Sequence, residues 1–538
     1  MIISFVIDTE YMGIKERNKW FLKCVSEAMK EDMIIVTHSY FRDHLQEVID
    51  ECSDRFYEQF EIDKYSVEDI RKLNICYIPD EWFERIYLKY KSRTKQLLYL
   101  YNEIDSQMMN YVSDYINNVL LSKGGVEPDY ILNCLHVFEF VRALSKRFSC
   151  PIIPWVFSAI RKVHGYSQTL YMAHIDNNLF NSNACKKMFA QSSKVDMGYS
   201  LFSKKEILAM LGKMHNFQLI PMVDASGSYD IGVIGEGFNL IPETYQSEMM
   251  TDDDIYYECK RLFSSNSIIS RVHPIQLDRS GVGRNHMKND PAAFILRCRR
   301  LVTLQSQMIL KAAMWNRSSV VMSDALPYAF LFNDKLIEDK PIDDYNLNFL
   351  LFAYLVPDKC MFSKKYWIWR MTSPKINEII KCHLDTIFDD LSIPKKYLQN
   401  SIGRLESILL IRGASEREIN CILNTNEVND VPEVYPSSCL RCIMMDKRTI
   451  LLYCLNHNRS DYIYSHFYIP KGCKYCEFIP QFDLDGYISI KEASINNINI
   501  ETEHIQKYYP KNTTVLSVEV NNPEEASFTA IWNGRQFS

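Results

Sequence analysis

The chain has 538 residues, 47% of them hydrophobic and 24% charged, and 61 Lys and Arg against 67 Asp and Glu give a formal net charge of −6. This length is too great for one hydrophobic core, and this composition excludes a disordered or fibrous protein. No basic run is long enough to neutralise a phosphate backbone, so nucleic acid is not expected as a partner.

The cysteine content and the apolar runs bear on the compartment. Asp8 and Glu10 interrupt the N-terminal apolar stretch, so the 16 cysteines are expected to be mostly free thiols in a reducing cytosol. The apolar runs at 130–144 and 347–357 are interrupted by charge or too short to cross a bilayer. Residues 86–101, IYLKYKSRTKQLLYLY, favour a solvated helix face. The alternative is peripheral association with the inner face of a membrane.

Residues 1–215 alternate short apolar runs with longer amphipathic segments. This β-α-β rhythm predicts a parallel sheet with helices on both faces, that is, an N-terminal Rossmann-like domain. The expected strands are 1–7, 33–39, 129–135 and 150–158, and the expected helical segments are 15–30, 66–122 and one ending at Arg147.

The rhythm restarts over residues 216–429, which predicts a second Rossmann-like domain. The expected fold class is therefore α/β, with two Rossmann-like domains facing a cleft. Strands are expected at 217–223, 230–237, 267–274 and 318–324, and helices at 252–263, 291–302, from about 304, and 364–411.

Residues 430–538 consist of short alternating runs separated by turn residues, which predicts a β-rich accessory domain. Two cysteine pairs in this region have a spacing that can hold structural zinc: Cys439, Cys442, Cys473 and Cys476. Residues i and i+3 of a strand face opposite sides of a sheet, so chance pairs are the favoured interpretation. Asp252, Asp253 and Asp254 are typical of the first turn of a helix, where acidic side chains complement the helix dipole, rather than of a metal site. A metal-independent activity is therefore expected.

A His-Pro pair ends the expected strand at 267–274. Pro274 fixes φ and stops a helix, so the imidazole of His273 is expected at the sheet edge, where it can donate to a phosphate oxygen. About 30 residues on, Ser306 and Gln307 open a helix whose first N–H groups favour anions. Each feature alone is more often a turn or an N-cap, but together they indicate a phosphate site.

These residues carry a resemblance. The stretches RVHPIQLD and TLQSQMILKAAMWNRSSVVMSDALPYAF, followed by NFLLFAYLVP and YWIWRM, resemble the C-terminal half of GT-B glycosyltransferases of bacterial capsule and lipopolysaccharide biosynthesis. The nearest group is the retaining Kdo transferases and the capsule-polysaccharide transferases, and the resemblance covers about 128–385. It implies a GT-B fold in which the domain 1–215 lies on the acceptor side and the domain 216–429 binds the nucleotide sugar. It also implies that His273, Pro274 and Ser306, with Gln307 beside them, hold the phosphate of a CMP-activated sugar.

Glycosyl transfer needs a carboxylate near the anomeric carbon and a cradle for the leaving phosphate. The candidate carboxylates are Glu236 in a Gly-flanked loop, Asp176 and Glu139, although Asp176 before two Asn residues is equally typical of a turn. Where the family segment carries a Glu, this chain has Ser158, and Glu236 stands where the family has an Asp.

Two arginines complete the candidate donor site. Arg271 precedes the His-Pro pair, and Arg370 lies in the aromatic run YWIWR, where the alternative is a surface arginine on a packed helix.

The implied function is the transfer of a sugar, Kdo or a related acidic sugar from a CMP donor, onto a growing surface glycan or glycolipid. The nucleotide sugar is the only co-substrate expected, with no further cofactor. Two alternatives stay open: a catalytically degenerate GT-B scaffold that binds nucleotide or glycan, and a nucleotide-sugar epimerase, which needs paired carboxylates but no acceptor.

Overall fold

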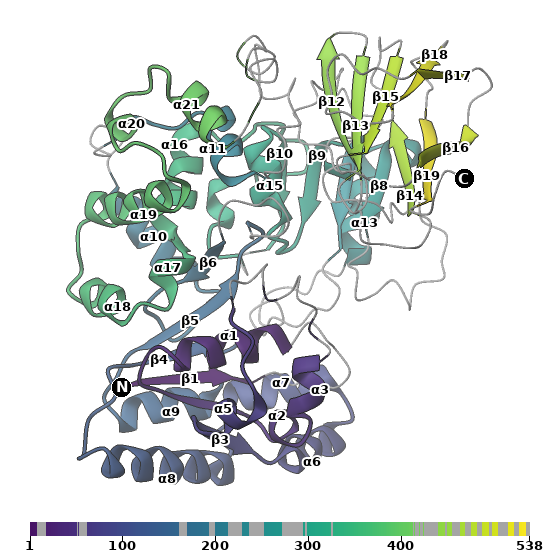
Figure 1. Ribbon diagram of the computed structural model, residues 1–538. Coiled ribbons are helices and arrows are strands. Elements are labelled where there is room, and N and C mark those ends of the chain that lie inside the picture. The colour runs from purple at the N-terminus through teal and green to yellow at the C-terminus, as the bar shows by residue number, and fades with distance from the viewer. Residues whose placement is uncertain are drawn as a thin grey trace.

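The computed structural model describes most of the chain up to residue 412 and, beyond it, chiefly backbone strands (Figure 1). Glu236, His273 and Pro274 lie outside the described residues, as do Cys439 and Cys473. The described residues are 1–7, 18–50, 52, 57, 62–160, 169–192, 199–212, 229–235, 252–271, 294–295, 298–323, 326–412, 414, 419, 423 and the strands between 440 and 533.

A seven-stranded sheet dominates the N-terminal part, in the order β11-β6-β5-β4-β1-β2-β3. The strands β1 to β5 pair in parallel, whereas β6 and β11 are antiparallel to their neighbours. The sequence therefore correctly predicts a parallel sheet. The strands are β1 (Ile2–Val6), β2 (Met33–His38), β3 (Asn74–Ile78), β4 (Tyr130–Cys134), β5 (Ile152–Phe157), β6 (Leu170–Ala173) and β11 (Leu355–Pro357).

Both faces of this sheet are buried, because its strands are mostly apolar and their successive side chains enter opposite cores. Ile2 and Val6 belong to one core, and Ile3 and Phe5 to the other. The first core is closed by α1 (Asn18–Ala28), α2 (Tyr40–Asp43), α3 (Leu45–Asp50), α5 (Val67–Arg71), α17 (Asp358–Met361) and α18 (Lys364–Met371). The second is closed by α6 (Asp80–Tyr90), α7 (Arg93–Asn102), α8 (Ser106–Ser122) and α9 (Glu139–Arg147).

Two strands of this sheet, β3 and β6, were not predicted from the sequence. β3 lies inside the segment 66–122 that was expected to be helical throughout, and β6 follows β5 without a predicted strand. Both are runs of four or five residues, and periodicity cannot separate so short a strand from a turn of buried helix.

The apolar run 347–357 lies in the interior of the protein. It continues α16 (Asp344–Phe349) as a π-helical turn, η5 (Leu350–Tyr354), and ends as β11, which pairs with β6. All of its residues are buried. Among the described residues, no helix is both long and apolar enough to cross a membrane. After the four strands of the second sheet, β7 to β10, the chain therefore returns to the first sheet through β11. No sequence pattern indicated this connection.

The second sheet has four parallel strands in the order β10-β9-β7-β8. One face packs on α13 (Asp252–Leu262), and the other joins the core that contains α15 (Met308–Met314). The strands are β7 (Tyr229–Ile234), β8 (Ile268–Arg271), β9 (Cys298–Thr303) and β10 (Ser318–Val321). The expected helix at 291–302 is wrong over β9, because residues 298–303 pair with β7 and β10 as a central strand that is buried except at Arg299.

Gly232 of β7 shows how tightly the second sheet is packed. A Cβ at this position would lie 2.4 Å from Cys298 Sγ, 2.9 Å from Leu301 Cδ2 and 3.0 Å from Phe294 Cζ. We therefore expect Gly232→Ala to lower the free energy of unfolding by about 1–3 kcal/mol, measured by urea denaturation. If the clash is the cause, Gly232→Ala combined with Cys298→Ala will cost less than the sum of the single changes. Additive losses would contradict this explanation.

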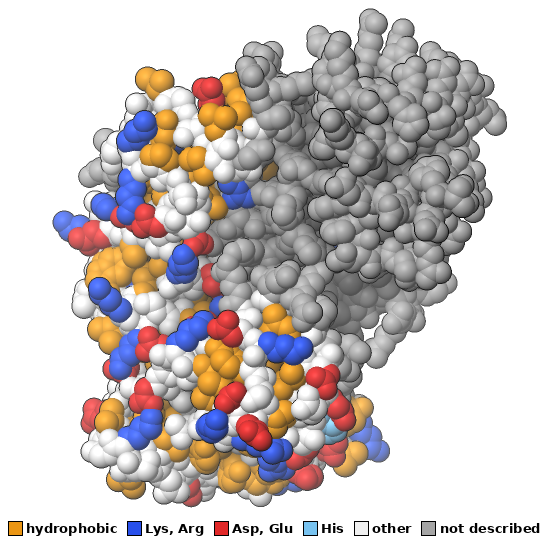
Figure 2. All heavy atoms as spheres, in the orientation of Figure 1, with side chains coloured by type: hydrophobic (Ala, Val, Ile, Leu, Met, Phe, Trp, Pro, Cys, Tyr) orange, Lys and Arg blue, Asp and Glu red, His pale blue; other side chains and the backbone are white. Residues whose placement is uncertain are grey.

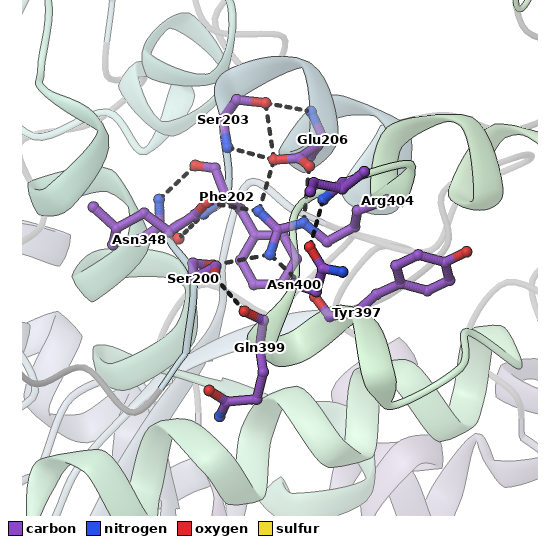
Figure 3. A network of polar contacts seen from close by, with 11 residues as sticks. Ser200, Phe202, Ser203, Glu206, Asn348, Tyr397, Gln399, Asn400 and Arg404 are labelled. Atoms are coloured by element: carbon purple, nitrogen blue, oxygen red, sulfur yellow. Dashed lines mark hydrogen bonds and ion pairs between the residues drawn. The ribbon is translucent and has the colours of Figure 1, made fainter.

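A group of helices extends the core of the second sheet and is shown at the upper left of Figure 1. The buried guanidinium of Arg404 joins three of these helices: it contacts the Glu206 carboxylate and donates to the backbone carbonyls of Tyr397, Ser200 and Leu201 (Figure 3). The helices are α10 (Ser182–Gln191), α11 (Lys204–Leu211), α19 (Ile376–Leu391), α20 (Lys396–Gln399) and α21 (Arg404–Ile411).

Beyond residue 440 the described residues are strands in two sheets, ordered β12-β13-β15-β18-β17 and β14-β19-β16. The accessory β domain itself stays a prediction. Cys442 lies on β12 and Cys476 on β15, and β13 lies between these two strands. The strands are β12 (Leu440–Asp446), β13 (Thr449–Cys454), β14 (Ile463–Tyr468), β15 (Tyr475–Pro480), β16 (Tyr487–Ala493), β17 (Ile498–Glu503), β18 (Val515–Val520) and β19 (Ser527–Asn533).

The described surface mixes charges of both signs. Figure 2 shows Lys and Arg interspersed with Asp and Glu over the N-terminal sheet and its helices, with hydrophobic side chains between them. Leu88, within the segment 86–101, is 67% exposed on α6, beside Lys89. Leu97 and Leu100 of the same segment lie in the second core of the first sheet, so the segment has a buried side and an exposed side.

Candidate functional site

The order of the four-stranded sheet defines a switch point. From β7 the chain moves to β8 on one side and then returns to β9 on the other, so the connections leave β7 and β9 in opposite directions. In open parallel sheets ligands bind at the carboxyl ends of the strands at such a point. The candidate site is therefore the edge where Gly235 follows β7, Arg271 ends β8 and residues 304–307 follow β9.

Thr303, the last residue of β9, holds the loop of this edge. Its buried hydroxyl accepts a hydrogen bond from the backbone N–H of Ser306 at 3.0 Å and lies 3.5 Å from the carbonyl oxygen of Ile234. The Ser306 hydroxyl in turn accepts a longer bond from Met308 N–H at 3.4 Å. The predicted residues Ser306 and Gln307 thus lie at the switch point, partly exposed, at the start of α15.

Arg271 ends β8, the neighbour of β7 on the side opposite to β9, and contacts residues that follow β7 and β9. Its carbonyl oxygen accepts from Gly235 N–H at 2.8 Å, and its guanidinium Nη1 lies 3.7 Å from Met308 Sδ. Arg271, Ser306 and Gln307 thus lie at the same carboxyl edge of the sheet, and the contact of Arg271 there is with Met308. A guanidinium, a hydroxyl and the N–H groups of a loop are the donors that bind phosphate in proteins.

Thr303 was not predicted from the sequence. The only available signal was a threonine at the end of an apolar run, three residues before Ser306, and many structural threonines share that pattern.

The corresponding edge of the first sheet has its switch point between β1 and β4, and Leu135 and His136 follow β4 there. Leu135 has a φ of 60°, a region that non-glycine residues occupy at some cost and that is frequent near functional sites. The Asn133 side chain supports this turn by donating to the His136 carbonyl at 2.9 Å. No sequence pattern pointed to His136.

The structure places the other carboxylate candidates away from the second sheet. Asp176 N–H donates to the carbonyl of Ile152, the first residue of β5, so Asp176 lies at the amino end of the parallel strands. Its Oδ1 accepts from Asn177 N–H at 2.6 Å, which fits the turn alternative. Glu139, at the start of α9, pairs with Arg142 at 2.8 Å.

Ser158 follows β5 at the carboxyl edge of the first sheet. It is buried, and its hydroxyl accepts from Ile160 N–H at 3.0 Å.

Arg370 belongs to a packed polar chain. Its Nη1 donates to the Tyr366 hydroxyl at 2.6 Å, and that hydroxyl lies 2.7 Å from His383 Nε2, whose Nδ1 is 3.1 Å from the carbonyl of Phe352. Tyr366 and Trp367 also lie beneath the guanidinium. The structure does not bring Arg370 to the switch point, and its contacts match the alternative of an arginine on a packed helix.

Burial of His383 predicts a pH dependence of stability. Desolvation and the nearby Arg370 lower the pKa of His383 to about 3 in the folded protein, from an ordinary value of 6.5. Between these values the unfolded chain binds the proton more tightly, so the stabilisation present above pH 6.5 is lost as the pH falls. From pH 7 to pH 5 this group alone is expected to lower the free energy of unfolding by about 2 kcal/mol.

Urea denaturation of the wild type and His383→Gln at both pH values isolates this contribution. The variant is expected to lose about 2 kcal/mol less than the wild type on acidification. Parallel losses in the two proteins would show that His383 does not titrate as its burial requires.

No metal site is seen in the described part of the chain, where no three His, Cys, Asp or Glu side chains gather as metal ligands would.

Comparison with known proteins gives distant structural likenesses. No protein-family model and no curated protein sequence matches the chain. A beta Kdo 2,4 transferase, KpsC of Thermosulfurimonas dismutans, aligns with 47% of this chain and 87% of its own at 10% identity and a TM-score of 0.31. A UDP-GlcNAc 2-epimerase of Methanocaldococcus jannaschii aligns with 65% of this chain and 98% of its own at 8% identity and a TM-score of 0.25. The glycotransferase of kitacinnamycin aligns with 78% of this chain and 98% of its own, at 10% identity and a TM-score of 0.24.

Proposed function

We propose that this protein is a glycosyltransferase that binds a nucleotide sugar at the carboxyl edge of the four-stranded sheet. The observation that supports the proposal is that Arg271, whose guanidinium lies beside Met308, and Ser306, which is bonded to Thr303, follow strands of one sheet at the same carboxyl edge. The resemblance of residues 271–278 and 303–330 to GT-B transferases supports the same assignment. The proposed donor is a CMP-activated sugar, Kdo or a related acidic sugar, and the proposed acceptor is a surface glycan or glycolipid.

In this proposal the chain's own residues bind the diphosphate or phosphate of the donor. As the bond to the anomeric carbon breaks, negative charge grows on the leaving phosphate, and the Arg271 guanidinium with the Ser306 hydroxyl stabilises it. His273 follows Arg271 by two positions and is assigned the role of a further donor to the phosphate. Glu236 directly follows Gly235 in sequence and is assigned as the carboxylate near the anomeric carbon.

The acceptor is assigned to the first sheet. Its switch point carries His136, which is partly exposed and follows the strained Leu135. Open parallel sheets bind ligands at this edge, so a second substrate can be accommodated there. Asp176 is not assigned a catalytic role, because it lies at the opposite edge.

Incubation of the purified full chain with CMP-Kdo and with UDP-N-acetylglucosamine, each with and without a glycan acceptor, tests the proposal. Mass spectrometry of the products separates the alternatives. An extended glycan with release of the nucleotide supports transfer. A new nucleotide sugar without acceptor would establish an epimerase, and unchanged donors in every mixture would favour the scaffold.

A further inference from the structure

Two cysteine thiols face each other where α17 meets α19. Cys360 of α17 is buried in the core of the first sheet, and Cys382 of α19 is partly exposed. The two thiols lie close enough for each to change the pKa of the other. Cys360 Sγ also lies 3.5 Å from the hydroxyl of Thr386, one helical turn beyond Cys382 on the same helix face. The pair therefore joins two helices that are adjacent in space and separated in sequence by α18.

The surroundings of the pair favour a thiolate on Cys382. The hydrogen bond from Cys360, with the charges of Arg370 and Lys381, lowers the pKa of Cys382 to about 7, against the opposing effects of burial and Asp385. The same hydrogen bond and burial raise the pKa of Cys360, which therefore stays a thiol. Cationic neighbours and partial exposure are the conditions that make a cysteine reactive.

Other described cysteines have the opposite character. Burial raises the pKa of Cys76 to about 12 and that of Cys150 to about 11. Both are buried, so they are expected to be inert thiols. Cys150 is thus a matched reference for the reactivity of Cys382.

We propose that Cys382 and Cys360 form a peroxide-sensitive dithiol, with Cys382 as the attacking sulfur and Cys360 as the resolving sulfur. The Cys382 thiolate attacks one oxygen of hydrogen peroxide, an S–O bond forms, the O–O bond breaks, and hydroxide leaves to become water. The Cys360 sulfur then attacks Cys382 sulfur, the S–S bond forms, the S–O bond breaks, and the departing hydroxide takes the Cys360 proton and leaves as water. Two thiols are oxidised and one peroxide is reduced to two waters.

The disulfide would link the segment that returns to the first sheet, β11 and α17, to the helix α19. Cys360 lies three residues beyond β11, and α17 packs against both β6 and α19. A bond from Cys360 to Cys382 ties this returning segment to α19 and closes a short loop that contains α18. Because such a closure restricts the unfolded chain, the oxidised protein is expected to melt at a higher temperature than the reduced one.

Mass spectrometry of the full chain, reduced, freed of reductant and treated with one equivalent of hydrogen peroxide, tests the proposal. We expect a peptide pair linked through Cys360 and Cys382 that disappears on reduction. Cys360→Ser should instead accumulate a sulfenic acid at Cys382 that dimedone traps, and Cys382→Ser should lose the linkage. At pH 7 iodoacetamide should alkylate Cys382 in the reduced protein at least about tenfold faster than Cys150.

Several results would overturn the proposal. A dimedone adduct at Cys382 of the wild type without any linkage would remove the resolving role of Cys360. Linkage of Cys382 to a cysteine other than Cys360 would do the same. Equal alkylation rates at Cys382 and Cys150 would remove the reactive thiolate. None of these measurements depends on glycosyl transfer, so they stand apart from the proposed function.

Discussion

Replacing Arg404 by methionine is expected to lower the free energy of unfolding by about 3–5 kcal/mol. Arg404 is fully buried at the start of α21, and its Nε and Nη2 lie 2.8 and 2.9 Å from the two carboxylate oxygens of Glu206. The side chain of Glu206 is only 7% exposed. Without the arginine this carboxylate would remain charged and buried without its partner, which is the costly outcome for an ion pair in a protein interior.

The other partners of Arg404 add to this cost. Its guanidinium donates to the carbonyls of Ser200, Leu201 and Tyr397 and lies 3.9 Å from the ring centroid of Phe202 (Figure 3). These carbonyls would lose a charged donor, and methionine offers none in return. The network therefore fixes α21 against the chain that leads into α11.

Urea denaturation followed by tryptophan fluorescence measures the loss, and Arg261→Met is the matched control. Arg261 pairs with Glu258 on the exposed face of α13, so its removal should produce no measurable change. Adding Glu206→Gln to Arg404→Met should recover part of the loss, because the uncompensated charge is gone. A loss for Arg404→Met no larger than that of the control would show that the ion pair does not hold this region.

Replacing Arg271 by glutamine is expected to lower turnover with the nucleotide sugar by roughly a hundredfold, as the loss of one donor to a developing charge does. The proposed phosphate site would keep Ser306 but lose its cation. Arg271 is only partly buried at the end of β8, so the melting temperature should change little. His273→Ala is expected to abolish turnover, likewise with little change in the melting temperature.

Steady-state kinetics of nucleotide release with Arg271→Gln, His273→Ala and the control Arg261→Gln measures these effects. The control removes the same charge from α13, a helix that covers the same sheet, and should retain wild-type turnover. If Arg271→Gln and His273→Ala also retain it, the phosphate site does not lie at this edge, although the fold would be unaffected.

The sequence by itself determined the helix and strand content where runs were long or strongly patterned. The buried strands β1, β2, β4, β5 and β10, the amphipathic helix α13 and the helices from Lys364 to Ile411 lie where the pattern predicts them. The reason is local: an apolar run bounded by turn residues, or a 3.6-residue period, is readable without knowing any partner. One further rule, that the carboxyl ends of parallel strands meet at one edge, predicts that His273 and Ser306 share this edge. This stays a prediction, because His273 lies outside the described residues.

Only the tertiary structure decided which segments are neighbours across long sequence distances. The pairing of β11 with β6 and the Glu206–Arg404 ion pair join residues more than 180 positions apart. The same is true at shorter range for the Cys360–Cys382 thiols, which belong to different helices. The tertiary structure also places Asp176 and Arg370 away from the switch point. Asp176 follows β6, which runs antiparallel to β5, and Arg370 bonds to Tyr366 within the packed helix α18; no local pattern encodes either contact. Residue type indicates which chemistry is available, but burial and strand order decide where that chemistry is assembled.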